Sequence, residues 1–311
     1  MSELRFDGRV AVVTGAGRGL GRAHALLLAE RGARVVVNDL GGSIGGSGTD
    51  AEPASDVAAE IVRAGGDAVA DTSDVSVPSG AEALIDAAVA RFGRIDVLVN
   101  NAGIVRWAGF PDADEENLAR HLAVHVGGSF HTTRAAWPHM SAQGYGRVVM
   151  TTSTGMLGLP ANTSYATAKG GVFGLARSLA TAGAPLGIKV NLVAPAAMTR
   201  MARRPSEADA GDAGVEDPMS PHLVAPMVAY LAHESCPVTG ELYAAGAGRF
   251  ARIFLACAPG YVHPGGEPDA GPSIEDVAAH WDTINDEAGY SVPADLPSWS
   301  ATFLSHLEPG G

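Results

Sequence analysis

The sequence predicts an α/β fold, a doubly wound parallel sheet of about seven strands with a C-terminal helical extension. Short apolar runs recur along roughly the first two hundred residues, and amphipathic stretches separate them. Strands that alternate with helices form parallel sheets covered on both faces. The 311 residues suffice for a sizeable core, and 46% hydrophobic with 18% charged residues exclude general disorder.

The predicted elements alternate regularly along the chain. Amphipathic helices are expected at residues 20–32 and 78–93, and both end in glycine, a common helix stop. Buried parallel strands are expected, in chain order, at residues 9–15, 33–39, 66–74, 94–103, 146–153, 187–195 and 240–246.

The remaining segments set the expected domain organisation. Residues 41–50, GGSIGGSGTD, are interpreted as a surface insertion within the domain, after the second strand. Residues 201–221 are rich in Pro, Asp and Gly, which predicts a mobile substrate loop. We therefore expect a main domain at 1–252 and an extension at 253–311.

The extension is expected to contain a helix at 272–289 with Ser273 as its N-cap. Its apolar stripe, formed by Ile274, Val277, Trp281 and Ile284, is expected to pack on the domain or on a partner subunit.

Charge and composition narrow the class of partner. The net charge of −13 disfavours nucleic acid and anionic membrane surfaces, and no apolar run could span a bilayer. Cys236 and Cys257 form no disulfide-rich or metal-spaced pattern, and the N-terminus lacks an apolar secretory segment. We expect a cytoplasmic protein without a metal and with a small-molecule substrate.

A glycine-rich turn joins the first strand to the first helix. In VVTGAGRGLGRA, Gly15, Gly19 and Gly21 let the backbone approach a pyrophosphate, and the helix N-terminus offers free N–H groups. The alternative is a tight turn with no ligand. The position of the glycine-rich turn at the first strand–helix junction favours dinucleotide binding.

Asp39 closes the second strand, 24 residues past Gly15. A carboxylate there accepts hydrogen bonds from the adenosine ribose and repels a 2′-phosphate, which predicts NAD rather than NADP. Arg18 in the glycine turn is a counterargument, because a guanidinium can bind that phosphate. The alternative role for Asp39 is a helix or turn cap.

The stretch STGMLGLPANTSYATAK carries the candidate reactive groups. Tyr165 and Lys169 lie four residues apart, so they share one face of a helix. The pKa of a free tyrosine is about 10, and a nearby ammonium lowers it. Ser153 ends the preceding strand, where its hydroxyl can bind a substrate oxygen. Ordinary structural roles remain the alternative for each of the three residues.

TGxxxGxG at 14–21, NNAG at 100–103 and YxxxK at 165–169 together resemble the short-chain dehydrogenase/reductase family, over about residues 6–250. The resemblance implies a Rossmann-like fold, an oxidoreductase that interconverts a secondary alcohol and a ketone, and a homodimer or homotetramer. It implies cofactor contacts at Gly15, Arg18, Gly19, Leu20, Gly21, Asp39, Asp74, Val75, Asn101, Ala102, Gly103, Tyr165, Lys169, Pro195 and Thr199.

Two departures from the family pattern bear on the catalytic residues. The family serine usually lies thirteen residues before the tyrosine; here Thr152 has that spacing, and Ser153 lies one residue later. Counting residues from the start of the strand at Gly146 instead places Ser153 at the catalytic position. We prefer this count, because the register of a strand fixes which way each side chain points. His125 stands where the family has a catalytic Asn. It is expected to be neutral, and either holds a relay water beside Lys169 or is structural.

VHVGGSFHTTRAAWPHM and VVVNDLGG are similar to one branch of the family. That branch is the (3R)-hydroxyacyl-CoA dehydrogenase unit of peroxisomal multifunctional enzyme type 2, also called 17β-hydroxysteroid dehydrogenase type 4, and its bacterial relatives. The resemblance implies NAD-dependent oxidation of a fatty or steroid side-chain CoA ester. A partner enoyl-CoA hydratase is expected to be a separate protein, because the sequence of this chain shows no hydratase unit. The alternatives are a 17β-hydroxysteroid or other free-alcohol dehydrogenase and, in another class, a non-catalytic dinucleotide-binding protein.

The candidate residues for binding the anionic CoA group are Arg203, Arg204, Arg249 and Arg252.

Overall fold

The structure is a computed structural model that describes residues 3–199, 201, 216–264 and 271–307. The chain divides into two compact units, Met1–Arg252 and Ile253–Gly311, which are described separately. Among the described residues, none of the helices has the length and apolar character needed to cross a membrane.

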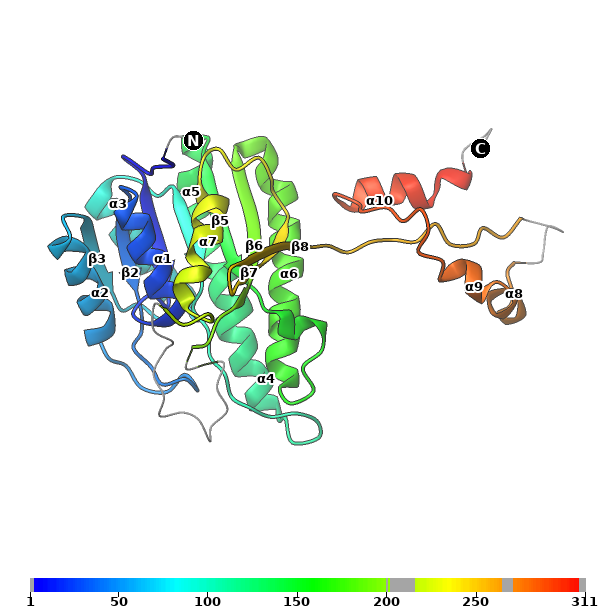
Figure 1. Ribbon diagram of the computed structural model, residues 1–311, viewed down its shortest axis with the longest axis horizontal. Helices are drawn as coiled ribbons and strands as arrows, with labels where there is room; N and C mark the ends of the chain where they lie inside the picture. Colours follow the sequence, from blue (N-terminus) through cyan, green and yellow to red (C-terminus); the bar gives the residue numbers. More distant parts are fainter. Residues whose placement is uncertain (1–2, 200, 202–215, 265–270, 308–311) are drawn as a thin grey trace. The chain divides into compact units, whose positions relative to one another are not determined.

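The first unit is built on one sheet with the strand order β3-β2-β1-β4-β5-β6-β7-β8 (Figure 1). Every neighbouring pair from β3 to β7 is parallel. The strand order reverses between β1 and β4, the position where open α/β sheets bind ligands at their carboxyl ends. The strands are β1 (Val10–Thr14), β2 (Arg34–Asn38), β3 (Asp67–Asp71), β4 (Val97–Asn100), β5 (Gly146–Thr151), β6 (Ile188–Ala196), β7 (Leu242–Gly246) and β8 (Arg249–Ile253).

The strand β8 adds one strand to the seven predicted. It follows β7 after two residues, Ala247 and Gly248, which both have positive φ. That backbone is typical of a type I′ hairpin turn, in which Asn, Asp or Gly is usual at the first position. Alanine there gave no hairpin signal in the sequence.

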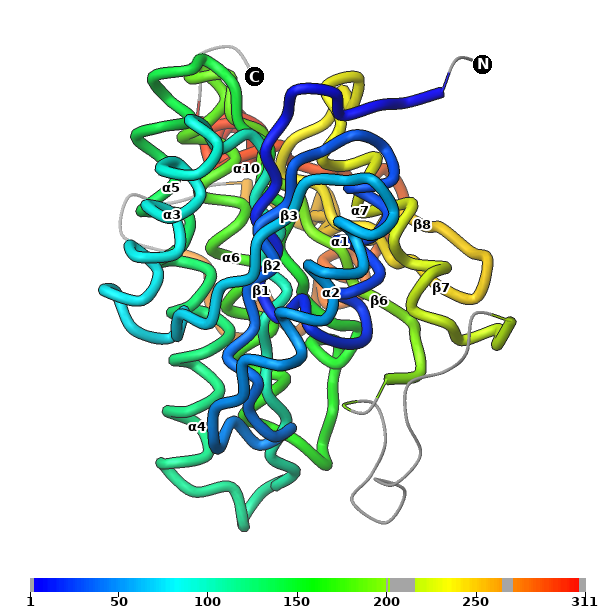
Figure 2. Tube along the Cα trace, turned by 90° about the vertical axis from the view of Figure 1, so that its left-hand side faces the viewer, coloured from blue at the N-terminus to red at the C-terminus, as the bar shows by residue number. Residues whose placement is uncertain are grey.

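Helices cover both faces of the sheet, with α1, α2 and α7 on one side and α3, α4, α5 and α6 on the other (Figure 2). The central strands are therefore buried on both faces, and Val35, Val36 and Val37 are fully enclosed. The elements are α1 (Gly19–Glu30), α2 (Glu52–Arg63), α3 (Pro78–Phe92), α4 (Glu115–His121), the π-helical turn η1 (Leu122–Gly127), α5 (Gly128–Gln143), η2 (Thr154–Leu157), α6 (Thr163–Gly183), η3 (Ala184–Leu186), η6 (Pro221–Leu223) and α7 (Ala225–Ala232).

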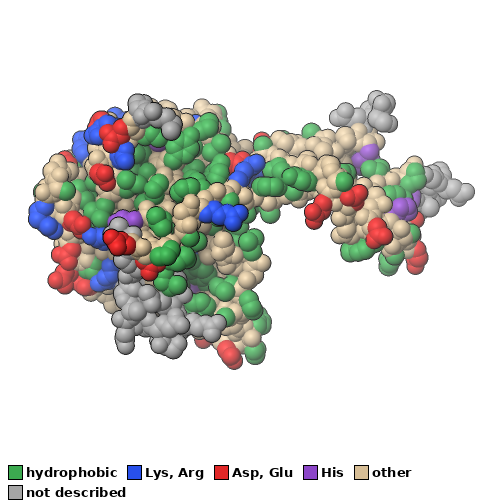
Figure 3. Space-filling view, viewed as in Figure 1, with side chains coloured by type: hydrophobic (Ala, Val, Ile, Leu, Met, Phe, Trp, Pro, Cys, Tyr) green, Lys and Arg blue, Asp and Glu red, His purple; other side chains and the backbone are tan. Residues whose placement is uncertain are grey.

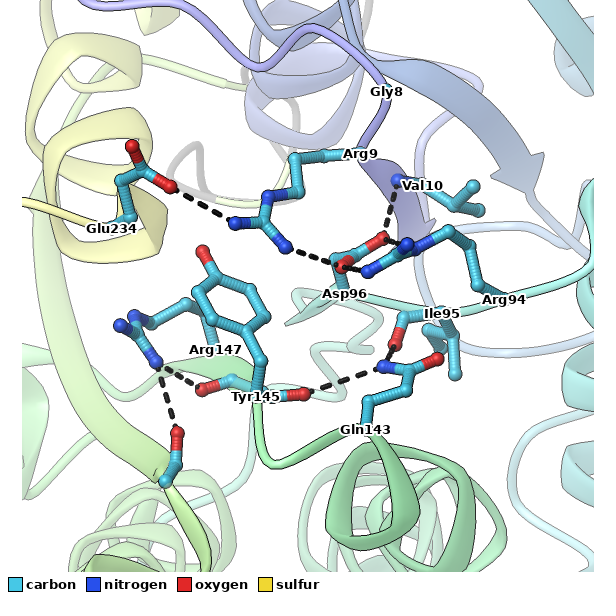
Figure 4. Close-up of polar contacts among 12 residues, drawn as sticks. Gly8, Arg9, Val10, Arg94, Ile95, Asp96, Gln143, Tyr145, Arg147 and Glu234 are labelled. Carbon is cyan, nitrogen blue, oxygen red and sulfur yellow. Dashed lines mark hydrogen bonds and ion pairs between the residues drawn. The ribbon is translucent and has the colours of Figure 1, made fainter.

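A cluster of charged side chains, here called the Asp96 cluster, lies at the amino ends of β1, β4 and β5 (Figure 4). The buried Asp96 carboxylate accepts from the Val10 N–H at 2.9 Å and pairs with Arg9 at 3.0 Å and Arg94 at 2.6 Å. The Arg9 guanidinium also lies 3.9 Å from the ring centre of Tyr145. The cluster joins three strands at the edge of the sheet opposite the glycine turn.

The second unit contains the short elements α8 (Ile274–Ala279), α9 (Trp281–Ile284), α10 (Leu296–Phe303) and η7 (Ser305–Leu307). Ser273 and Asp276 form a capping box at the start of α8, as Ser273 predicted. The predicted helix at 272–289 is interrupted at His280, whose backbone departs from helical geometry. No described side chain of this unit is fully buried, and many of its large hydrophobic side chains are exposed (Figure 3).

Candidate active site

The glycine turn requires glycine for two different reasons. Gly15 has a φ of +63°, and a Cβ there would lie 2.8 Å from the Cα of Ala102. A Cβ on Gly21 would lie 2.1 Å from the carbonyl oxygen of Gly15, so α1 could not pack beneath the turn. The turn therefore brings backbone and the N-terminus of α1 to the carboxyl edge of the sheet, as a pyrophosphate site requires.

The end of β4 holds this turn in place. The Asn101 side-chain amide donates to the carbonyls of Thr14 at 2.9 Å and Gly15 at 3.1 Å. The Thr14 hydroxyl oxygen accepts from the backbone N–H groups of Asn101 and Ala102, both at 3.0 Å. The NNAG motif thus acts on the glycine turn through Asn101 and does not merely lie beside it.

Asp39 lies at the carboxyl end of β2 with both oxygens engaged. One oxygen accepts from the Gly17 N–H in the glycine turn at 2.8 Å, and the other accepts from the Gly41 N–H at 2.7 Å. Each carboxylate oxygen has a further lone pair that can accept from a ribose hydroxyl. Arg18, which could favour NADP, lies 3.9 Å from the carboxylate of Asp50.

A cavity of about 370 Å³ runs from the glycine turn to the end of β5. Gly21 lies beneath the turn and does not line it. His125 also does not line it. The predicted residues that do line it are Gly15, Arg18, Gly19, Leu20, Asp39, Asp74, Val75, Asn101, Ala102, Gly103, Ser153 and its alternative Thr152, Tyr165, Lys169, Pro195 and Thr199.

Sequence reasoning missed part of the cavity wall. Gly42, Ser43, Ile44 and Gly46 line it, although residues 41–50 were interpreted only as a surface insertion. The available signal was its position, because the segment directly follows Asp39 at the ligand-binding edge of the sheet. Other lining residues that were not predicted include Ile104, Val105, Trp107, Arg120, Val124, Leu159 and Asn162.

The three candidate reactive side chains face the same cavity. Asn162 caps α6 by accepting from the Tyr165 N–H at 3.2 Å, which fixes the first turn that carries Tyr165. One helical turn later, the Lys169 ammonium lies 5.6 Å from the Tyr165 ring centre and donates to the Thr151 carbonyl at 2.7 Å. The Ser153 hydroxyl oxygen accepts from the Gly155 N–H at 3.0 Å.

Burial controls the protonation of Tyr165 and Lys169. Burial raises the pKa of Tyr165, whereas a hydrogen bond with Ser153 lowers it. Burial also lowers the pKa of Lys169 to about 7, because desolvation penalises the ammonium. The lysine can therefore change its charge near neutral pH, beside a phenol whose own ionisation is disfavoured.

Thr152, the alternative to Ser153, has a different environment. Its side chain is fully buried, and its hydroxyl donates to the Lys169 carbonyl at 2.7 Å. Ser153 is half-buried and lies at the start of the loop after β5. The one proton of the Thr152 hydroxyl is thus used inside the fold.

His125 lies in the π-helical turn η1 and is fully buried. Its Nε2 bonds the Ile104 carbonyl at 2.9 Å, and its Nδ1 has no partner among the described residues. The ring meets the Tyr165 ring edge to face at 5.3 Å and stacks on His121 at 5.9 Å. Burial, assisted by the charge on Lys169, holds the pKa of His125 well below its usual value. His121, which the sequence reasoning did not select, also contacts Tyr165.

Of the four arginines expected to bind CoA, the two that the structure describes, Arg249 and Arg252, do not line the cavity. Arg252 pairs with Glu241 at 2.6 Å on β8, Arg249 is exposed on the same strand, and neither lines the cavity. Arg203 and Arg204 lie outside the described residues, as does most of the predicted loop at 201–221.

Comparison with known proteins places this geometry in context. The family model described as short chain dehydrogenase matches residues 9–210. A short-chain type dehydrogenase/reductase from Mycobacterium tuberculosis is 44% identical and covers 91% of this chain and 96% of its own. Peroxisomal multifunctional enzyme type 2 from Drosophila melanogaster is 42% identical over 98% of this chain, which spans 50% of that protein.

Solved structures agree with these relatives. A short chain dehydrogenase from Mycobacterium avium has a TM-score of 0.74 and 37% identity, covering 91% of this chain and 97% of its own. Full-length peroxisomal multifunctional enzyme type 2 from Drosophila melanogaster has a TM-score of 0.78 and 35% identity, covering 98% of this chain and 50% of its own.

Proposed function

This chain belongs to the short-chain dehydrogenase family of oxidoreductases acting on CH–OH groups, and we propose that it oxidises (3R)-3-hydroxyacyl-CoA esters to 3-oxoacyl-CoA with NAD. The observation that carries the reaction type is the shared cavity, in which Ser153, Tyr165 and Lys169 face the glycine turn. The similarity to peroxisomal multifunctional enzymes supports the substrate class, since the sequence resembles their hydroxyacyl-CoA dehydrogenase unit. Family members act on small molecules and usually form oligomers, and we propose a homodimer or homotetramer here.

We assign the acid–base role to Tyr165. In the oxidation, its phenolate oxygen takes the proton of the substrate hydroxyl, and the Lys169 ammonium below it stabilises the phenolate. Ser153 donates to the substrate oxygen and holds it beside the tyrosine. When bound, the nicotinamide cofactor accepts the hydride that leaves the carbinol carbon.

For His125, the geometry supports a positioning role. The ring is enclosed behind Tyr165 and does not line the cavity, so we assign it no contact with substrate. Because Nε2 donates to the Ile104 carbonyl, the neutral ring keeps a bare Nδ1 and adds no second cation beside Lys169.

The NAD preference rests on Asp39. Its carboxylate is fixed by two backbone N–H groups at the carboxyl end of β2, where the adenosine ribose of a bound dinucleotide lies. The nearby carboxylate of Asp50 opposes use of Arg18 as a phosphate ligand. The residues present therefore fit a dinucleotide without the 2′-phosphate.

The decisive experiment follows NADH formation with a (3R)-3-hydroxyacyl-CoA and, in parallel, with the matching CoA-free hydroxy acid. We expect turnover of the thioester with NAD and much lower kcat/KM with NADP. Turnover of free secondary alcohols or steroids without the thioester would instead establish the alternative substrate class. A higher kcat/KM with NADP than with NAD would refute the proposal that Asp39 sets a preference for NAD.

A further inference from the structure

The segment 41–50 is a closed loop rather than an open linker. Its two ends meet, because the Asp50 N–H donates to the Leu40 carbonyl at 3.0 Å. Gly41 has a φ of +76°, and a Cβ there would lie 1.8 Å from the Asp50 carbonyl oxygen. The backbone at the base of the loop is therefore in direct contact, which is the form of a compact Ω-loop.

The tip of the loop is ordered by its own hydrogen bonds. The Ser43 N–H donates to the Ser47 carbonyl at 2.8 Å, and the Gly46 N–H donates to the Ser43 carbonyl at 2.9 Å. The Ser47 N–H also donates to the Ser43 hydroxyl oxygen at 3.1 Å. The glycine-rich tip therefore adopts a hydrogen-bonded turn, and it can move as a rigid unit.

That tip is bonded to the far wall of the cavity. The Val105 N–H donates to the Ile44 carbonyl at 2.9 Å, and the exposed Arg120 guanidinium donates to the Gly46 carbonyl at 2.8 Å. Gly46 packs so closely on Ile104 that a Cβ at position 46 would lie 2.9 Å from the Ile104 side chain. Val105 follows β4, and Arg120 lies on α4.

The strand order shows what the loop crosses. It leaves the end of β2 and bonds residues beyond the end of β4, and β1 lies between these two strands. The glycine turn stands at the end of β1, in the crevice at the reversal of strand order. The loop therefore bridges that crevice, and the tube in Figure 2 shows it reaching α4.

We propose that residues 41–50 form a latch across the dinucleotide site, and that Arg120 is a positioning residue that holds the latch closed. This inference rests on the proposed cofactor site. Asp39 connects the two, because one of its oxygens accepts from Gly17 in the glycine turn and the other from Gly41 in the latch. A bound dinucleotide leaves when the contacts of Ile44 and Gly46 break.

The first experiment loosens the latch. Arg120→Gln removes the charged donor to Gly46, and Arg134→Gln is the matched control, an exposed arginine on α5 that does not line the cavity. The rate of NADH release is measured by rapid displacement with excess NAD, without substrate. We expect about 5- to 10-fold faster release from Arg120→Gln, as loss of one charge-assisted hydrogen bond at an exposed site implies, with the control unchanged.

Two outcomes would overturn the latch. Release from Arg120→Gln at the rate of the control would show that the contact does not restrain the cofactor. A raised KM for hydroxyacyl-CoA with unchanged NADH release would show that Arg120 binds substrate. In the supporting outcome, KM for the cofactor rises in step with the faster release of NADH.

The second experiment locks the latch and predicts the opposite sign. A Cβ on Gly45 would lie 3.7 Å from the Arg106 Cγ, so Gly45→Cys with Arg106→Cys places two thiols within reach of a disulfide. The oxidised protein should release NADH more slowly, and reductant should restore the rate. Each single-cysteine variant is a control, and the Arg106 variant also reports loss of its pair with Glu116.

Equal release from the oxidised and reduced forms, with the disulfide verified by mass, would contradict the proposal. Because NADH release is measured without substrate, the test does not depend on the acyl-CoA assignment. Failure of the wild-type protein to oxidise hydroxyacyl-CoA would refute that assignment and leave the comparison of release rates intact.

Discussion

The two edges of the sheet bury charge in opposite ways. At the amino edge, Asp96 is enclosed but meets Arg9, Arg94 and the Val10 N–H, so its charge is compensated. At the carboxyl edge, Lys169 is equally enclosed, and its ammonium bonds the neutral carbonyl of Thr151. The first arrangement stabilises the fold, and the second keeps Lys169, a proposed catalytic group, in an environment that opposes its charge.

This difference predicts how substitutions at the two edges of the sheet change the stability of the protein. Removing a compensated charge leaves its partners buried or half-buried without a counter-charge, which costs free energy of unfolding. Removing an uncompensated charge relieves a desolvation cost. Substitutions at the two edges should therefore change stability with opposite signs.

The largest expected effect is on turnover at the carboxyl edge. Tyr165→Phe removes the phenol that we propose exchanges the proton, and kcat should fall by about 10²- to 10⁴-fold. The midpoint of thermal unfolding should stay near that of wild type, since the ring and its contacts with His121 and His125 remain. Turnover of hydroxyacyl-CoA and a thermal scan measure the two quantities. Undiminished turnover would remove Tyr165 from the mechanism.

At the amino edge, Asp96→Ala should lower the free energy of unfolding by about 3 to 5 kcal/mol, because Arg9 and Arg94 lose a buried partner. Urea unfolding measures this change. Glu234→Ala is the matched control: Glu234 also pairs with Arg9 but is exposed, so its loss should cost under about 1 kcal/mol. Equal costs for the two variants would mean that burial of Asp96 contributes nothing.

Lys169→Met tests the opposite sign. The unfolded chain holds the lysine proton up to about pH 10.5 and the folded chain only up to about pH 7, so the free energy of unfolding rises with pH across this window. Lys169→Met should raise the free energy of unfolding at neutral pH by about 1 to 3 kcal/mol and should weaken its increase with pH. Turnover should be lost in the same variant. A less stable variant at neutral pH would show that Lys169 contributes to the fold.

The smallest effect concerns His24 on α1, which is buried with neither ring nitrogen bonded among the described residues. Burial lowers its pKa from 6.5 to about 3, so the unfolded chain takes up a proton at higher pH than the folded chain. Stability should fall by about 1 kcal/mol between about pH 7.5 and about pH 5.5. His24→Leu should remove that part of the fall in urea unfolding at the two pH values.

Local patterns explain most of what could be predicted. The apolar runs located all seven parallel strands, because strands covered on both faces need uninterrupted hydrophobic sequence. The family motifs pointed to Tyr165, Lys169 and the glycine turn, which face one cavity. The strand β8 was missed because Ala247 gave no turn signal for its positive φ.

Other features depend on contacts distant in sequence. The helix predicted at 272–289 breaks at His280 although its apolar stripe continues past the break. Nothing in GGSIGGSGTD indicates that its tip bonds Val105 and Arg120, residues more than fifty positions later. A glycine-rich composition suggested flexibility, whereas the hydrogen bonds that order the loop come from its own backbone and from another element.

The two N–H groups held by Asp39 also constrain protein engineering. Glycine or alanine at position 39, a direct way to admit the extra phosphate of NADP, would strand the N–H groups of Gly17 and Gly41. Both would have to find new acceptors, and the turn and the loop would shift together. A designer of altered coenzyme preference should begin from side chains that retain an acceptor oxygen at position 39, such as asparagine or serine, and place new cations nearby.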